Sequence, residues 1–261
     1  MSLSNTTVRF IPDEATSADE LAIAALHLHT YTTAAALVRP GDQVLDIGFG
    51  EGYGAEILRD AGAEYLGIEL DSGIVEHARD RYGPYFEAYG GSTISAPNGT
   101  FDLVLMLQVI ALIPEPPVVL AEIKRVLKPG GQGVVTTPNR IYRLADGQRP
   151  WNRHHCREYT ADELERELRA VFADVRVHGV FASEPIDSLV KARGARARRL
   201  ARLDPLGLHH RLPDSLNARI RRVLRRSAQP DVDPAEFALD QIWLSQERAE
   251  LGLDLLAYVR P

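Results

Sequence analysis

The sequence predicts a doubly wound α/β fold, in which helices cover both faces of a mainly parallel, Rossmann-like sheet. Two observations support this prediction. Apolar runs of strand length recur along the first half of the chain, and segments with helical spacing of apolar residues separate them. Right-handed crossovers between parallel strands then place helices on both faces of the sheet. The runs are "QVLDIG" (43–48), "YLGIEL" (65–70), "FDLVLML" (101–107) and "GVVTTP" (133–138).

Three stripes of apolar residues predict helices between successive strands. Within each stripe the residues repeat at the spacing that brings them onto one face of a helix. The stripes consist of Ile57, Leu58 and Ala61, of Ile74, Val75 and Ala78, and of Val118, Val119, Ile123, Val126 and Leu127.

The second half of the chain predicts one helix and two more strands. Thr160, with Glu163 three residues later, has capping-box spacing, which predicts a helix that begins here and runs to about Phe172. A strand follows at "DVRVHGVF" (174–181), and the alternating run "LDLLAYVR" (253–260) predicts a last strand antiparallel beside it. The chain between Pro138 and Thr160 is too long for an ordinary connection, which is typical of a functional loop.

The length of 261 residues predicts one core domain with additions, and the composition indicates a globular protein. Neither an apolar run of membrane-spanning length nor a secretory signal is present, and the lone Cys156 cannot form an internal disulfide. We therefore expect a cytoplasmic protein. The net charge is −6 but uneven, because residues 191–226 carry twelve Lys and Arg against two Asp and are +10, which leaves −16 for the remainder.

The stretch "VLDIGFGEGYGAEIL" (44–58) places a glycine-rich loop at the end of the first strand. A dinucleotide fingerprint counted from Gly48 would need its third glycine at Tyr53, and no Walker lysine is nearby. Glu51 within the loop would repel a pyrophosphate. A cationic adenosine derivative such as S-adenosylmethionine fits better, and Glu69, at the end of the second strand, can accept hydrogen bonds from both ribose hydroxyls. The alternative is a tight turn followed by a solvated acid.

Four segments together resemble the class I S-adenosylmethionine-dependent methyltransferases, over roughly residues 20–182 and the last strand. They are "VLDIGFGEGYGAEIL", "GIELD", "GTFDLVLMLQVIALIPEPPVVLAEIKRVLKPGG" and "VVTTPNR". The resemblance implies S-adenosyl-L-methionine as cofactor and a seven-stranded sheet whose last strand is antiparallel. It also implies cofactor-binding residues: Asp46, Gly48, Gly50 and Gly52 around the methionine end, Glu69 on the ribose and Leu70 on the adenine.

The same resemblance implies three further contacts. Gln108 occupies a position that contacts cofactor or substrate, and Tyr31 in "HLHTY" resembles a residue that reaches the cofactor in some members. Many members have an adenine-binding acid where this chain has Gly90, so Ser92 or the backbone of "GGS" would have to serve. Members also often have Glu-His where this chain has Ala111 and Leu112, so a mechanism that uses that histidine is not available here.

The loop "WNRHHCREY" (151–159) is the expected catalytic segment, because ligands bind beyond the carboxyl ends of parallel strands. Methyl transfer to a hydroxyl needs a base, and a histidine near its ordinary pKa of ~6.5 suits this role. His155, which aligns with a histidine of related methyltransferases, or His154 is the predicted general base. Two alternatives remain: the adjacent histidines bind a divalent ion such as Mg²⁺ with a carboxylate, or His155 only orders the loop.

A basic helical insert is expected at residues 183–229, while residues 1–182 and 230–261 form the methyltransferase domain. The insert would cap the acceptor site, form a homodimer or bind an anionic surface; the alternative is that it packs on the core with a solvated basic face. Its helices lack aromatic residues to stack bases or anchor in a bilayer, so neither nucleic acid nor a membrane is the expected partner. The expected helices have apolar stripes at Ile186, Leu189, Val190, Ala197 and Leu200, and at Leu216, Ile220, Val223 and Leu224.

The functional prediction is an O-methyltransferase that acts on a hydroxyl of a sugar or oligosaccharide. "TTPNR", "HHCREYT", "LDPLGL" and the arginine-rich insert resemble actinobacterial sugar O-methyltransferases, including those that cap methylated mannose polysaccharides. One alternative is N- or O-methylation of a natural product or a quinone-like small molecule. The other is a protein that binds nucleic acid or modifies RNA through the basic insert.

Overall fold

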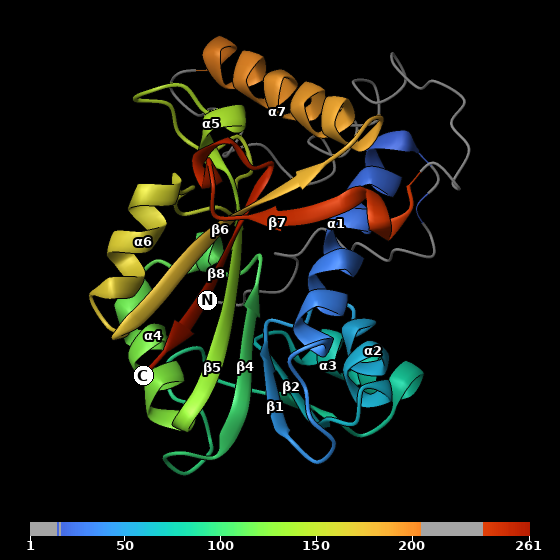
Figure 1. The fold of residues 1–261 in the computed structure, drawn as a ribbon, viewed down its shortest axis with the longest axis vertical. Helices are drawn as coiled ribbons and strands as arrows, with labels where there is room; N and C mark the ends of the chain where they lie inside the picture. Colours follow the sequence, from blue (N-terminus) through green and yellow to red (C-terminus); the bar gives the residue numbers. More distant parts are fainter. Residues whose placement is uncertain (1–14, 16, 205–236) are drawn as a thin grey trace.

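The computed structural model describes residues 15, 17–204 and 237–261, and its centre is an eight-stranded mixed sheet (Figure 1). The strand order is β3-β2-β1-β4-β5-β8-β6-β7. Strands β1 to β5 pair in parallel, whereas β8 lies antiparallel between β5 and β6. The strands are β1 (Gln43–Ile47), β2 (Glu64–Glu69), β3 (Phe86–Ala88), β4 (Phe101–Leu107), β5 (Leu127–Pro138), β6 (Asp174–Ala182), β7 (Ile242–Ser245) and β8 (Asp254–Arg260).

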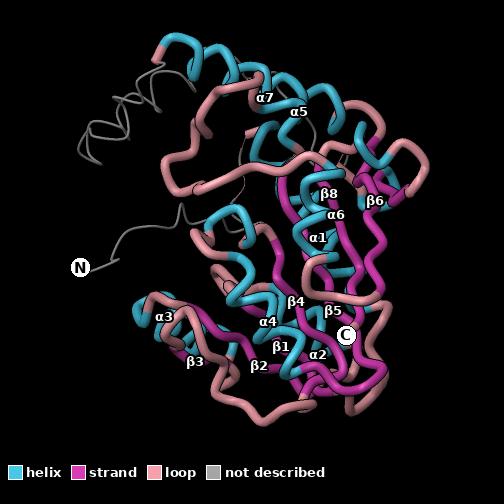
Figure 2. Tube along the Cα trace, turned by 90° about the vertical axis from the view of Figure 1, so that its left-hand side faces the viewer, coloured by secondary structure: helices cyan, strands magenta, loops and turns pink. Residues whose placement is uncertain are grey.

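Helices cover both faces of this sheet, which confirms the doubly wound prediction (Figures 1 and 2). One face packs against α1 (Ala18–Ala35), α2 (Gly54–Asp60) and α3 (Ser72–Tyr82). The other packs against α4 (Pro116–Val126) and α6 (Ala161–Arg169). The remaining helices are α5 (Arg140–Arg143) and α7 (Ile186–Leu203), with short 3-10 turns η2 (Ile110–Leu112), η5 (Leu239–Gln241) and η6 (Ala249–Leu251).

The seven-stranded expectation is close but not correct in detail. The last strand is antiparallel as predicted, and it lies between β5 and β6. The additional strand is β7, which pairs antiparallel with Gly179–Ala182 at the edge of the sheet. It is only four residues long, and it forms because an unpaired β6 edge would leave backbone N–H and C=O groups without partners.

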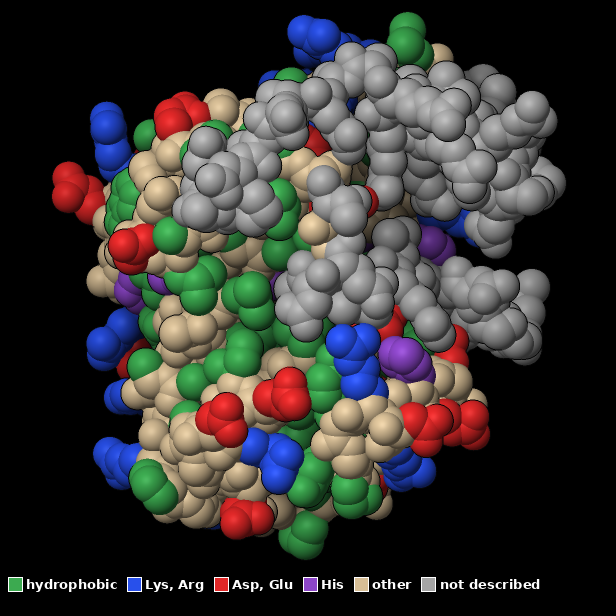
Figure 3. All heavy atoms as spheres, turned by 90° about the vertical axis from the view of Figure 1, so that its right-hand side faces the viewer, with side chains coloured by type: hydrophobic (Ala, Val, Ile, Leu, Met, Phe, Trp, Pro, Cys, Tyr) green, Lys and Arg blue, Asp and Glu red, His purple; other side chains and the backbone are tan. Residues whose placement is uncertain are grey.

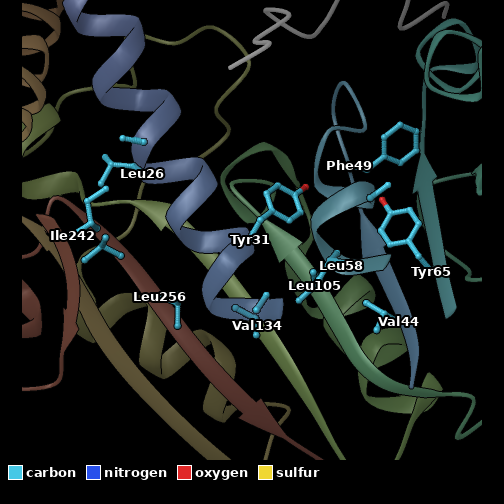
Figure 4. Packing of buried hydrophobic residues seen from close by; sticks show 14 of the residues in the cluster. Leu26, Tyr31, Val44, Phe49, Leu58, Tyr65, Leu105, Val134, Ile242 and Leu256 are labelled. Carbon is cyan, nitrogen blue, oxygen red and sulfur yellow. The ribbon is translucent and has the colours of Figure 1, made fainter. Parts of the chain in front are cut away.

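The apolar stripes are buried largely as predicted. Ile74, Val75 and Ala78 of α3 are all buried, and so are Val119 and Ile123 of α4. Figure 4 shows the layer between α1 and the sheet, where Leu26, Val134, Ile242 and Leu256 lie close together. Each such side chain stabilises the fold by roughly 1.5–3 kcal/mol through its removal from water. On the outward face of the α1 to α3 layer, the described acidic, basic and apolar side chains are interspersed (Figure 3).

The predicted capping box is present at the start of α6. The Thr160 hydroxyl accepts from the Glu163 N–H, and the Glu163 carboxylate accepts from the Thr160 N–H. We expect Thr160→Ala to lower the free energy of unfolding by ~1 kcal/mol, because it removes one of these bonds from the helix terminus. Urea denaturation measures this change. Thr32→Ala, on an exposed part of α1, is the control and should change stability by less than ~0.5 kcal/mol; equal losses in the two variants would contradict the capping role.

The described part of the basic insert is α7, which packs against α5 and α1. Figure 1 shows it crossing above α5, beyond the carboxyl ends of the central strands. Gly194 allows a close approach, because a Cβ there would lie 2.7 Å from the backbone oxygen of Tyr142. The second expected helix, with Leu216 and Ile220, lies outside the described residues. Within the described ranges, no helix combines the length and apolarity that crossing a bilayer requires.

Candidate functional site

The glycine loop follows β1 and has three glycines in left-handed backbone conformations. Their φ angles are 72° at Gly48, 61° at Gly50 and 87° at Gly52. A Cβ at Gly48 would lie 2.5 Å from Val109 Cγ2, and one at Gly52 would meet three side chains at 3.1 Å. A Cβ at Gly50 would meet no atom of the described chain within 4 Å. Packing therefore requires Gly48 and Gly52, whereas Gly50 leaves open backbone on which a ligand can lie.

Asp46, at the end of β1, is a fully buried carboxylate. Its Oδ2 accepts hydrogen bonds from the hydroxyls of Tyr31 (2.9 Å) and Tyr65 (3.2 Å), two rings that flank the loop in Figure 4. Its Oδ1 is also buried but has no hydrogen-bond partner within the described part of the chain. Burial raises the pKa of Asp46 to about 7, although the two tyrosines lower it. Among the described residues, therefore, no group donates a hydrogen bond to Oδ1.

Glu69 and Leu70 combine an acid with an apolar shelf at the end of β2. Glu69 Oε1 accepts from the Leu70 N–H at 2.7 Å. Burial raises the pKa of Glu69, and backbone N–H groups of Leu70, Gly50 and Asp71 partly counteract this, so the carboxylate lies beside the glycine loop. Leu70 is 49% exposed, and a Cβ on Gly91 would lie 3.0 Å from its Cδ2.

The "GGS" segment (90–92) therefore lies next to the side chain of Leu70. Ser92 itself is exposed in that segment. The open backbone, the acid and the apolar shelf together suit the ribose and base of an adenosine derivative.

Gln108 lies at the carboxyl end of β4 in a left-handed conformation, with φ of 63°. Its backbone N–H donates to both oxygens of Thr136, each at 3.0 Å. Its amide Nε2 donates to Oδ2 of Asp254 at 2.9 Å. Gln108 therefore points to the first residue of β8, which sequence reasoning missed. The available signal was an acid at the start of the last alternating run.

His155 and Glu158 form a buried pair in the loop after β5. His155 Nδ1 lies 2.9 Å from Glu158 Oε1, and Arg143 Nε donates to the same oxygen at 3.0 Å. Burial raises the pKa of Glu158, but His155 and Arg143 together hold it below its ordinary value. An ionised carboxylate only accepts, so in the neutral imidazole Nδ1 carries the hydrogen and Nε2 carries the lone pair. Sequence reasoning missed that Glu158 pairs with His155 and Arg143. The spacing of three residues between His155 and Glu158 was a signal for the first pairing.

Backbone contacts tie this loop to the segment that follows Gln108. The N–H groups of Cys156 and Arg157 donate to the Ala111 carbonyl at 2.8 and 3.3 Å. His155 is thereby held at the same edge of the sheet as Gln108. His154 is placed by its backbone N–H, which donates to Asn152 Oδ1 at 3.1 Å.

No grouping of metal ligands supports the Mg²⁺ alternative within residues 15, 17–204 and 237–261. In these ranges, three His, Cys, Asp or Glu side chains are nowhere gathered as a metal site requires. His27 Nδ1 instead lies 3.1 Å from the Tyr53 hydroxyl. Burial, and to a smaller extent the charge of Arg193 of α7, lower the pKa of His27 to about 4. A residue of the insert thus acts electrostatically on a side chain of α1.

Comparison with known proteins agrees with this arrangement. Residues 45–135 match the family model described as a methyltransferase domain. A "probable S-adenosylmethionine-dependent methyltransferase" of Mycolicibacterium smegmatis is 36% identical over 143 residues, covering 54% of this chain and 56% of that protein. A fatty-acid O-methyltransferase of the same species is 33% identical over 136 residues, covering 50% of this chain and 49% of that protein. The chain spans about half the length of these curated relatives.

A solved structure shares the fold. The S-adenosylmethionine dependent methyltransferase from Mesorhizobium loti has a TM-score of 0.53 and 17% identity, over 89% of this chain and 98% of that chain. At this identity the likeness concerns the architecture alone.

Proposed function

We propose that the protein is an S-adenosylmethionine-dependent methyltransferase that methylates a hydroxyl of a sugar or oligosaccharide, and the match of residues 45–135 to a methyltransferase domain supports the first part of this proposal. The observation that carries the proposal is the His155–Glu158 pair, held at the same edge of the sheet as the open glycine loop. A base and a cofactor cradle at one edge are what hydroxyl methylation needs.

The residues present fit the cofactor. Asp46 Oδ1 is buried without a partner in the described chain, and Gly50 leaves open backbone. In the proposed complex Asp46 and the three loop glycines hold the methionine end, Glu69 accepts from the ribose hydroxyls, and Leu70 packs on the adenine. When bound, S-adenosylmethionine supplies an electrophilic methyl group on a sulfonium.

His155 is the proposed general base. Its Nε2 would accept the proton of the acceptor hydroxyl, which makes that oxygen a better nucleophile. Glu158 keeps Nδ1 protonated and stabilises the imidazolium that forms, and Arg143 holds Glu158 in place. His154 remains the second candidate for the base.

The sugar acceptor is supported by the sequence resemblance of the catalytic loop and the insert. A second candidate, a lipid-like or quinone-like acceptor, is supported by similarity to a fatty-acid O-methyltransferase and to a ubiquinone biosynthesis O-methyltransferase. A screen that measures release of S-adenosylhomocysteine separates them. Neutral glycosides, fatty acids and quinols are each assayed with added Mg²⁺ and with a chelator; turnover of glycosides alone supports the proposal, and turnover of only the lipid-like acceptors refutes it.

Cofactor affinity is expected to depend on pH through Asp46. Burial raises its pKa to about 7, so its protonated fraction grows as the pH falls through 7. A cationic ammonium binds the ionised form better; affinity for S-adenosylhomocysteine should therefore fall by up to about tenfold per pH unit below 7 and level off above it. Calorimetry between pH 5.5 and 8.5 measures this. In Asp46→Asn the remaining affinity should be weaker and less dependent on pH; an unchanged profile would exclude Asp46 as the titrating group.

A further inference from the structure

Asp254 is an acidic residue at the edge of the sheet where the proposed acceptor binds, and it has no role in the proposed proton transfer. It is the first residue of β8, where its backbone pairs with Pro138 of β5 and Val180 of β6. Because β8 runs antiparallel to these strands, its first residue lies at their carboxyl ends. This is the same edge that carries Gln108 and the catalytic loop.

Charged groups from three other elements face Asp254. Arg143 of α5 and Arg193 of α7 lower its pKa, and Glu158 of the catalytic loop raises it. Burial is the largest influence and raises the pKa to about 6, yet the residue keeps partial contact with solvent. A small polar ligand can therefore reach this largely buried carboxylate from the solvent.

The carboxylate has spare hydrogen-bonding capacity. Oδ2 accepts from Gln108 Nε2 at 2.9 Å, whereas Oδ1 accepts from no group in the described chain. Gln108 is in turn held in a left-handed conformation, with φ of 63°, that is strained for a non-glycine residue. Strain of this kind concentrates at ligand-binding positions.

We propose that Asp254 is a specificity-determining residue that accepts a hydrogen bond from a second hydroxyl of the acceptor, beside the hydroxyl served by His155. The inference rests on the proposed function and narrows its substrate class to neutral polyols. An acceptor with a carboxylate at this position has no hydrogen to donate to Asp254, so it cannot replace the hydroxyl. Gln108, through its bond to Oδ2, fixes the orientation of the Asp254 carboxylate.

The test measures binding directly and needs no turnover. The protein saturated with S-adenosylhomocysteine is titrated with methyl α-mannopyranoside, a neutral polyol, and with hexanoate, followed by ligand-observed NMR. We expect the glycoside to bind and hexanoate to bind more weakly or not at all. No binding of the glycoside, or tighter binding of hexanoate, overturns the proposal without any variant.

Asp254→Asn separates ligand binding from structure, because an asparagine oxygen can still accept from Gln108. We expect about tenfold weaker glycoside binding, from loss of a charge-assisted hydrogen bond, with S-adenosylhomocysteine affinity unchanged. Asp174→Asn, an exposed acid on β6 at the opposite end of β8, is the matched control and should bind like the parent. Parent-like binding by Asp254→Asn means that Asp254 only positions Gln108. Failure to bind S-adenosylhomocysteine at all would refute the proposed function separately.

Discussion

Replacement of His155 with alanine is expected to lower kcat by about 10²–10⁴-fold while S-adenosylhomocysteine affinity stays the same. The reason is geometric: the Glu158 carboxylate 2.9 Å from Nδ1 leaves Nε2 as the lone-pair nitrogen, so loss of the ring removes the proton acceptor. Kinetics with any acceptor that supports turnover measure kcat, and calorimetry measures cofactor affinity.

Two further variants show whether the loss of kcat comes from the base itself. His154→Ala tests the second candidate for the base and should retain most of the parent rate if His155 is the base. Glu158→Gln keeps the shape of the pair but removes the charge that stabilises an imidazolium, so a loss smaller than that of His155→Ala is expected, accompanied by a shift in the pH profile of kcat. If His155→Ala turns over at the parent rate, the histidine only orders the loop.

Substitution of Gly50 with alanine is expected to weaken S-adenosylhomocysteine binding by about tenfold or more. At φ of 61° an alanine is strained by roughly 1–2 kcal/mol. Its methyl group meets no atom of the described chain within 4 Å, so the fold has room for it. That room is where the bound cofactor would approach the backbone, and the methyl group would displace it. Calorimetry gives the change in affinity.

The chain offers a matched control for this substitution. Gly147 has a similar φ of 73°, and a Cβ there also meets nothing within 4 Å of the described chain. Gly147→Ala therefore imposes comparable backbone strain far along the sequence from the glycine loop. It should lower the melting temperature as much as Gly50→Ala does and leave cofactor affinity intact. Equal affinity in the two variants would mean that Gly50 serves the turn and not the ligand.

The sequence by itself determined the layered α/β architecture and predicted the class of cofactor. Both depend on signals that are local in the chain. The alternation of apolar runs and helical stripes sets the elements, and the packing periods are properties of single helices and strands. The glycine loop and Glu69 lie within 22 residues of one another, at the ends of adjacent parallel strands. Such strand ends meet at one edge in any doubly wound sheet.

Only the tertiary structure decided which polar groups meet. Gln108 and Asp254 are 146 residues apart and are joined because β8 is inserted between β5 and β6. Arg143 reaches Glu158 because the loop after β5 folds back on itself, and Oδ2 of Asp46 accepts hydrogen bonds from tyrosines of α1 and β2. Likewise, the edge strand β7 forms by pairing with the free edge of β6, and its own four residues are too few to predict a strand. Periodicity carries no information about such pairings, because they follow from strand order and loop closure.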